Sequence, residues 1–218
     1  MMILVMSCPV FSQTFRLDKD ASAFVEPQSL VVLAAGLGLA KAVTGWDDRA
    51  NSHLEENWIL EFSDVTNLYG SSRYNLPASL IFWSYTRMRG GETARALSSD
   101  IIRSLVYVQA VVGPIKHAVG RERPDGSNKL SFPSGHTANS FAMAELFRGR
   151  FGWKAGVPLY TLGVLTALGR MEENLHHLSD VVAGATIGYA IGRAVNGRTH
   201  SRINIAPYRQ GLAVSTSF

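Results

Sequence analysis

The chain has 218 residues, of which 46% are hydrophobic and 17% are charged, so it can bury one sizeable core but cannot hold a second full domain. Its net charge of +4 comes from scattered Arg and Lys residues, which argues against nucleic-acid binding and for a local anionic ligand. The single cysteine, Cys8, excludes an internal disulfide and a cysteine-rich zinc site.

The first segment, residues 1–11, is apolar and ends in small residues near Ser12. It resembles the end of a secretory signal, although it is short and lacks a positively charged start. Residues 5–8 also resemble a lipoprotein box in which Cys8 would carry the lipid, and an ordinary apolar start explains the segment equally well. We treat residues 1–24 as a signal or anchor segment and irregular N-terminus, and expect a membrane-associated or exported protein, with the bacterial periplasm as the suspected compartment.

Six apolar, helix-compatible runs follow, without an alternating strand pattern between them. They span residues 29–43, 76–88, 94–118, 137–147, 157–168 and 179–195. Gly-rich or Pro-bearing joints separate the runs. We expect an all-α bundle of about six helices over residues 25–195, and a short irregular or extended tail over residues 196–218 in which 211–218 favours a strand or an extended arm.

Membrane insertion is ambiguous from the sequence, because the mean hydropathy of +0.06 lies between the values of soluble and multi-span proteins. A spanning helix needs about 20 mostly apolar residues. Charged residues interrupt the runs before that length, at Lys41, Arg87, Lys116 and Arg193. The runs at 29–43 and 179–195 come closest, so a short, tilted membrane bundle and a soluble bundle both stay open, and we favour membrane association.

A polar segment, residues 45–75, lies between the first two runs. Its aromatic residues are Trp46, Trp58, Phe62 and Tyr69. The mixture suits an amphipathic lid or an interfacial segment, but we favour the alternative, in which the aromatic side chains pack on the bundle.

The first polar segment of chemical interest joins the third and fourth runs. Lys116 closes a helix and Arg123 stands directly before Pro124, so both cations can converge on one anion. The alternative is a helix C-terminus whose dipole is complemented by basic residues. Arg121 could also touch a substrate, although we expect it to be solvated.

The second segment, residues 132–137, precedes the fourth run. The backbone N–H groups of Ser134 and Gly135 and the Ser134 hydroxyl can face an anion at the helix N-terminus. His136 would lie in the first turn, close enough to protonate a leaving oxygen. A serine N-cap with an incidental histidine is the simpler alternative.

The third segment, residues 169–180, leads into the last run. His176 and Asp180 are four residues apart, a spacing that on a helix puts both on one face, where the carboxylate can hold one ring nitrogen and leave the other free to attack phosphorus. Arg170 adds a planar cation suited to phosphate oxygens. A surface or capping pair is the alternative. His177 has no such carboxylate, and we expect a structural role for it.

Together the three segments resemble the signature of the type 2 phosphatidic acid phosphatase superfamily, which reads Lys-x6-Arg-Pro, Pro-Ser-Gly-His and Ser-Arg-x5-His-x3-Asp. Every charged position falls at the family's spacing and in its order, and Gly169 replaces the usual serine. The resemblance covers residues 25–195. The charged residues without a family position are His117, Arg121, Glu122, Glu172 and Glu173, and we expect them to be solvated.

The resemblance implies a metal-independent phosphatase without a cofactor, in which His176 is the nucleophile, Asp180 orients it and His136 is the acid and base. The phosphate ligands that it implies are Lys116, Arg123, Ser134, Gly135 and Arg170. Its substrate would be a phosphorylated lipid, as a monoester or diphosphate, or a small phosphomonoester. The sequence does not define an oligomeric state.

Two other functions stay open. The superfamily includes vanadium-dependent haloperoxidases, which use a similar pocket but are usually much larger than this chain. A noncatalytic phosphate- or lipid-binding protein would keep the cations, yet the intact His136, His176 and Asp180 argue against it.

Overall fold

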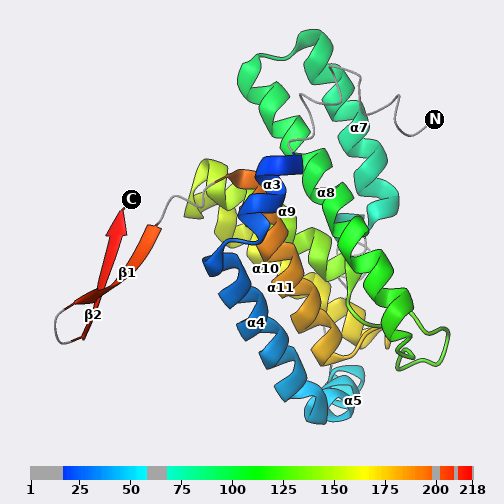
Figure 1. The fold of residues 1–218 in the computed structure, drawn as a ribbon. Coiled ribbons are helices and arrows are strands. Elements are labelled where there is room, and N and C mark those ends of the chain that lie inside the picture. Colours follow the sequence, from blue (N-terminus) through cyan, green and yellow to red (C-terminus); the bar gives the residue numbers. More distant parts are fainter. Residues whose placement is uncertain (1–16, 58–67, 198–201, 209–210, 218) are drawn as a thin grey trace.

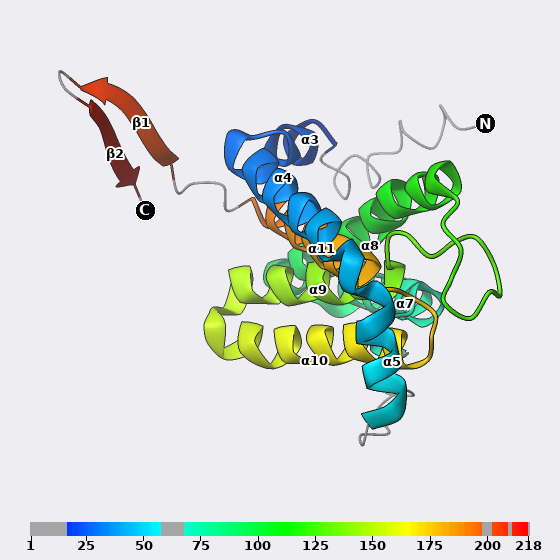
Figure 2. The same ribbon diagram turned by 90° about the horizontal axis from the view of Figure 1, so that it is seen from below.

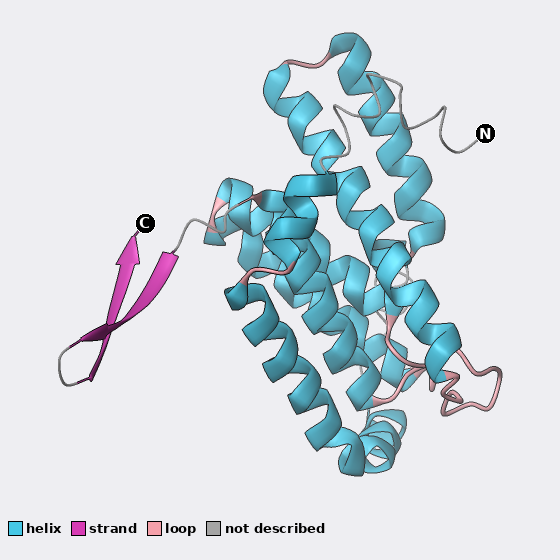
Figure 3. Cartoon of the chain, viewed as in Figure 1, coloured by secondary structure: helices cyan, strands magenta, loops and turns pink. Residues whose placement is uncertain are grey.

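The computed structural model describes residues 17–57, 68–197, 202–208 and 211–217, which form a helical bundle followed by a β-hairpin (Figures 1 and 3). The described helices and strands are α3 (Leu17–Phe24), α4 (Pro27–Ala42), the 3-10 helix η1 (Val43–Trp46), α5 (Asp47–Asn57), α7 (Ser72–Arg89), α8 (Glu92–Val119), α9 (Gly135–Phe151), α10 (Trp153–Glu172), α11 (Leu178–Asn196), β1 (Arg202–Tyr208) and β2 (Gly211–Ser217).

The expected all-α bundle is confirmed, and each of the six apolar runs lies in an α-helix except for Val43, the last residue of the first run, which begins η1. These helices are α4, α7, α8, α9, α10 and α11. The described part adds α3 and α5, which have too few apolar residues to stand out as apolar runs. In α5, Asp47 and Asp48 occupy the first turn, where negative charge complements the helix dipole.

The core lies around α11 and α9, which cross with their backbones in contact. Gly184, Gly188 and Gly192 recur every four residues on α11, and a Cβ atom on any of them would collide with a carbonyl oxygen of α9 or its N-cap. Large side chains from α8 complete the core, including the fully buried Leu105 and Val108. Because glycine permits this close crossing, the start of α11 is held directly against the start of α9.

Seen from below, α10 lies beside α9 and α4 lies against α11 (Figure 2). The two runs that come closest to the length of a membrane span, 29–43 in α4 and 179–195 in α11, differ in burial. Residues of α11 are mostly buried in the core, whereas on α4 the side chains of Leu30, Val31, Leu37 and Leu39 are exposed. One described helical stretch, Pro27–Leu54, is long and apolar enough to cross a membrane, with 11% of its apolar window buried.

The aromatic residues of the polar segment do not behave alike. Trp46 is 65% exposed, while the Tyr69 hydroxyl donates a hydrogen bond to the carbonyl of Ser140 at 3.4 Å. Trp58 and Phe62 lie outside the described residues. The exposure of Trp46, at the junction of η1 and α5, therefore does not fit the expectation that this residue packs on the bundle.

The C-terminal tail contains two antiparallel strands, with Arg202 opposite Ser217 and Tyr208 opposite Gly211. In Figure 1 this hairpin projects away from the helices. The division of the chain into residues 1–24, 25–195 and 196–218 stays a prediction.

Candidate active site

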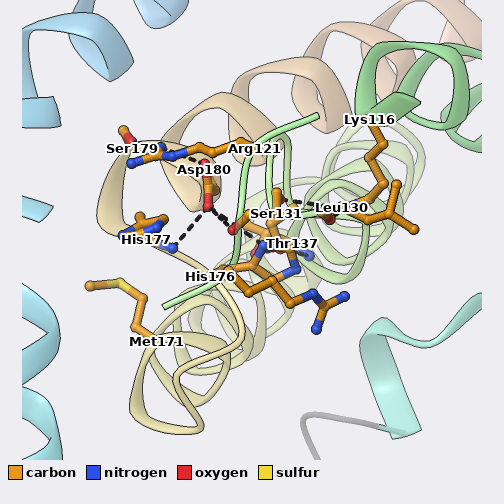
Figure 4. Close-up of polar contacts among 12 residues, drawn as sticks. Lys116, Arg121, Leu130, Ser131, Thr137, Met171, His176, His177, Ser179 and Asp180 are labelled. Carbon is orange, nitrogen blue, oxygen red and sulfur yellow. Dashed lines mark hydrogen bonds and ion pairs between the residues drawn. The ribbon is translucent and has the colours of Figure 1, made fainter. Parts of the chain in front are cut away.

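The three predicted segments meet at one end of the bundle, where α8 ends and α9 and α11 begin (Figure 4). The backbone N–H of Ser134 donates to the carbonyl of Asp180 at 3.0 Å, which ties the second segment to the third. The backbone N–H of His176 donates to the carbonyl of Arg170 at 3.2 Å, which folds the third segment back on the end of α10. Residues far apart in the sequence thus surround one site.

Lys116 brings the first segment into this site. Its Nζ donates hydrogen bonds to the carbonyls of Leu130 at 2.5 Å and Ser131 at 3.3 Å, and its Cε lies 3.9 Å from where a Cβ on Gly135 would stand. Burial, followed by the charge of Arg123, lowers the pKa of Lys116 to about 8. The ammonium group is therefore charged at neutral pH and loses its proton under mildly alkaline conditions.

Ser134 is the N-cap of α9, as one of the two interpretations of the sequence anticipated. Its Oγ accepts a hydrogen bond from the Thr137 backbone at 3.5 Å and lies 3.0 Å from the Thr137 hydroxyl, and the residue is fully buried. The hydroxyl is therefore engaged within the helix rather than directed at an anion. The N–H groups of Gly135 and His136, in the same first turn, have no acceptor inside the helix, a position in which backbone N–H groups can bind an anion.

His136 lies in the first turn of α9 and is partly buried. Burial, followed by the charges of Arg170, His176, Lys116 and Arg123, lowers its pKa to about 3. The imidazole is neutral at pH 7 in the absence of a ligand. A phosphate dianion in the site would offset the surrounding cations and raise the pKa of His136, which is the change that a general acid needs.

His176 and Asp180 are close together, but not on one helical face as the sequence suggested. His176 precedes α11, whose first residue is Leu178, so only Asp180 is helical. The reversal of the chain after α10, with Asn174 at a positive φ of 54°, brings the ring back toward the helix start. His176 Nδ1 lies 3.8 Å from Asp180 Oδ2, and both side chains are almost completely buried.

Asp180 is held by several donors. Its Oδ2 accepts hydrogen bonds from the Ser131 hydroxyl at 2.5 Å and the His177 backbone at 2.9 Å, and its Oδ1 accepts from Arg121 at 2.7 Å. Burial alone would raise the pKa of Asp180, but His176 and these donors together lower it to about 2. Asp180 is therefore a fixed carboxylate, while burial lowers the pKa of His176 to about 4 and keeps that ring neutral.

The remaining predicted cations, Arg170 and Arg123, differ in burial. Arg170 is 6% exposed and its Nη1 forms an ion pair with Glu173 Oε2 at 2.8 Å, so Glu173 is not a solvated charge as expected. Arg123 is less buried, and its Nε donates to Asn128 Oδ1 at 3.0 Å. Both guanidinium groups bring positive charge to His136.

Asp47 contacts this site and was not identified from the sequence, whereas Arg121 was named there only as a possible substrate contact. Arg121 was expected to be solvated, yet its guanidinium bridges Asp180 Oδ1 and Asp47 Oδ2, each at 2.7 Å. Asp47 also accepts hydrogen bonds from the backbone and hydroxyl of Ser179 at 2.8 and 2.7 Å. The 74 residues that separate Asp47 from Arg121 leave no spacing pattern that could have revealed the contact.

His177 takes a structural position, as expected. It is the N-cap residue of α11, and its Nε2 lies 3.3 Å from the carbonyl of Glu122. Among the described residues, no group of three or more His, Cys, Asp or Glu side chains is placed to hold a metal ion. The site that the described residues form is a cluster of cations and histidines, suited to an anion.

Comparison with known proteins agrees with this geometry. Residues 99–202, which contain all three segments, match the family model of the PAP2 superfamily. Lipid A 1-phosphatase of Porphyromonas gingivalis is 36% identical over 107 residues, which are 48% of this chain and 24% of that protein. The match thus spans about a quarter of this relative. The resemblance deduced from the three segments is confirmed.

Two solved structures share the fold. A transmembrane PAP2 type phosphatidylglycerolphosphate phosphatase from Bacillus subtilis superposes with a TM-score of 0.60 at 19% identity, over 83% of this chain and 96% of that one. LpxE of Aquifex aeolicus superposes with a TM-score of 0.53 at 18% identity, over 67% of this chain and 92% of that one.

Proposed function

From the match of residues 99–202 to the PAP2 superfamily, we propose that the chain is a phosphatase that hydrolyses a phosphate monoester or diphosphate of a lipid through a phosphohistidine, without a metal ion. The observation that carries the proposal is the pairing of a buried, neutral His176 with the ionised Asp180 beside a group of cations. A neutral imidazole is a nucleophile, and the carboxylate stabilises the cation that forms when the ring attacks.

The phosphoryl group would bind between Lys116, Arg123 and Arg170, with the first-turn N–H groups of α9 beneath it. Arginine and lysine neutralise the charge on the phosphoryl oxygens. The first-turn N–H groups of Gly135 and His136, which have no acceptor within α9, add hydrogen bonds and the positive end of the helix dipole. These donors are fixed before the substrate arrives, which is the condition for electrostatic stabilisation of a transition state.

In the first step, the free ring nitrogen of His176 forms a bond to phosphorus while the bond from phosphorus to the leaving oxygen breaks. His136, which takes up a proton when the bound phosphate raises its pKa, gives that proton to the leaving oxygen, and Asp180 orients and stabilises the cationic ring of His176. In the second step, His136 takes a proton from water, the water oxygen bonds to phosphorus, and the bond to His176 breaks. Inorganic phosphate leaves and both histidines return to their starting state.

A lipid substrate and membrane association are supported by two independent observations. The exposed apolar side chains of α4 lie in the stretch Pro27–Leu54, which is long and apolar enough to cross a bilayer. The relative from P. gingivalis is named for a phosphorylated lipid. The suspected periplasmic location and the choice between lipid and soluble substrates stay proposals.

Phosphate release by the purified protein in the presence of a chelator tests the proposal. The substrates are a short-chain phosphatidic acid in detergent and a soluble aryl phosphate, and the variants are His176→Ala and, as control, His117→Ala at an exposed position. We expect release from the lipid by the wild type and His117→Ala, and none by His176→Ala. Preference for the aryl phosphate would overturn the lipid assignment.

The same preparation separates the alternative functions. If phosphate is bound but never released, the chain is a binding protein. Halide oxidation by peroxide after addition of vanadate, without phosphatase activity, would identify a haloperoxidase. Activity that disappears with the chelator would contradict a metal-independent mechanism.

A further inference from the structure

A buried carboxylate from another part of the chain lies behind the proposed catalytic pair. Asp47 is the first residue of α5 and is 3% exposed. Its Oδ1 accepts the backbone N–H of Ser179 at 2.8 Å, and its Oδ2 accepts the Ser179 hydroxyl and Arg121 Nη2, both at 2.7 Å. A buried carboxylate with three short donors is firmly held, because losing any of them would leave a charge unpaired.

Arg121 connects this carboxylate to Asp180. Its Nη1 donates to Ser179 Oγ at 2.6 Å and to Asp180 Oδ1 at 2.7 Å, while Nη2 donates to Asp47. The planar guanidinium thus bridges two carboxylates, an arrangement that its fork of donors permits and that a lysine ammonium cannot reproduce. In Figure 4, Arg121 and Ser179 lie on the side of Asp180 away from His176.

The charges of Asp47, Arg121 and Asp180 show what the second carboxylate contributes beside Asp180. Arg121 alone would neutralise Asp180 and weaken its attraction for a cationic ring. With Asp47 on the other side, the three ionised groups carry one net negative charge that faces His176. That charge is matched when the ring becomes positive during attack on phosphorus.

We infer that Asp47 is a positioning residue, which acts through Arg121 and Ser179 to hold Asp180 in place and to preserve its negative charge toward His176. This inference rests on the proposed phosphatase function and extends its site to α5. Asp47 directly follows η1, within the same apolar helical stretch that contains α4. The stretch that contacts the bilayer in our proposal therefore also contributes to the geometry of the nucleophile.

Asp47→Asn tests the inference against its neighbour Asp48→Asn, which makes the same charge change at an exposed position. We expect kcat to fall about 10-fold to 100-fold in Asp47→Asn, the scale on which supporting residues and small misplacements act. KM and the inhibition constant of inorganic phosphate should stay within about 2-fold, because the cationic ligands are unchanged. Asp48→Asn should match the wild type. Unchanged kcat in Asp47→Asn, or an equal loss in both variants, would overturn the inference.

Arg121→Lys provides a second variant in case Asp47→Asn unfolds. It keeps the positive charge but cannot bridge both carboxylates, so we expect the same loss of kcat with the same KM. In the double variant the two losses should not add, because both break one connection to Asp180. Full activity of Arg121→Lys would overturn the bridging role.

A wild type that releases no phosphate would overturn the proposed function rather than this inference. The inference would then be tested on the His176 ring itself by NMR titration. This ring faces Asp180, Lys116, Arg123 and His136. Asp47→Asn should shift its titration to lower pH and Asp48→Asn should not; equal titrations in all three proteins would overturn the inference.

Discussion

His176 Nδ1 lies 3.8 Å from Asp180 Oδ2, too far for a hydrogen bond and close enough for an ion pair once the ring carries a proton. Burial keeps the ring neutral at pH 7 and the donors around Asp180 keep that carboxylate ionised. The contact should therefore shorten as positive charge develops on the ring. Such tightening on passing from the free enzyme to the reacting complex is common at catalytic sites.

Replacement of Asp180 by Asn tests this relationship. We expect kcat to fall by about three orders of magnitude, because the ring loses both its orientation and its counter-charge; the matching change in the Ser-His-Asp triad costs roughly 10⁴. The inhibition constant of inorganic phosphate should change much less. A rise in that constant equal to the fall in kcat would show that Asp180 acts in binding rather than in orientation.

The alkaline side of the pH profile should report Lys116. Its lowered pKa of about 8 means that KM rises above pH 8 as the ammonium loses its proton. In Lys116→Arg the cation persists to higher pH, so the alkaline limb of kcat/KM should move upward. Lys41→Arg, at an exposed position on α4, is the control. An alkaline limb that stays near pH 8 in Lys116→Arg would assign the titration to another group.

The two histidines of the site should make the fold sensitive to acid. The pKa values are about 3 for His136 and about 4 for His176 in the folded chain, against 6.5 without burial. Between the folded and the unfolded pKa values, the unfolded chain binds more protons than the folded chain. The free energy of unfolding therefore rises with pH and falls on acidification. The Tm of thermal unfolding should fall from pH 7 to pH 4, and the slope of Tm against pH should be smaller in His176→Asn. An equal slope in that variant would contradict the assignment.

A substitution where α9 and α11 cross should change both the free energy of unfolding and the phosphatase activity. A Cβ on Gly184 would collide with the carbonyl of Ser134, so Gly184→Ala should lower the free energy of unfolding by about 1–3 kcal/mol and reduce phosphate release. Gly38→Ala on α4 is the matched control, since nothing lies within 4 Å of its added Cβ. Wild-type stability in Gly184→Ala would show that the two helices can separate without cost.

The six long helices could be predicted because apolar runs bounded by glycine and proline are local patterns. The convergence of the three motifs is a tertiary feature, and it was expected from the resemblance to the family signature, in which Lys116 with Arg123 and His176 with Asp180 fall at the family's spacing. Polar helices such as α5 give no such pattern. The position of α5 depends on a tertiary contact, that of the buried Asp47 carboxylate with Arg121 and Ser179, and no local sequence feature predicts this contact.

The position of His176 shows a second limit of the sequence. A four-residue spacing predicts two side chains on one helical face, and the prediction of proximity holds although the helix starts only at Leu178. The turn at Asn174 and the hydrogen bond from His176 N–H to the Arg170 carbonyl replace the expected helical turn. Loop conformation of this kind depends on contacts with neighbouring segments rather than on spacing.

Detection of the phosphorylated enzyme tests the central claim most directly. The wild type and the Asp180→Asn variant would be mixed with a short-chain phosphatidic acid in chelator, quenched under alkaline conditions that preserve phosphohistidine, and digested for mass spectrometry. We expect phosphate on His176 and none on His177 or His136. Turnover without phosphate on any histidine, or phosphate on His177, would contradict the proposed mechanism.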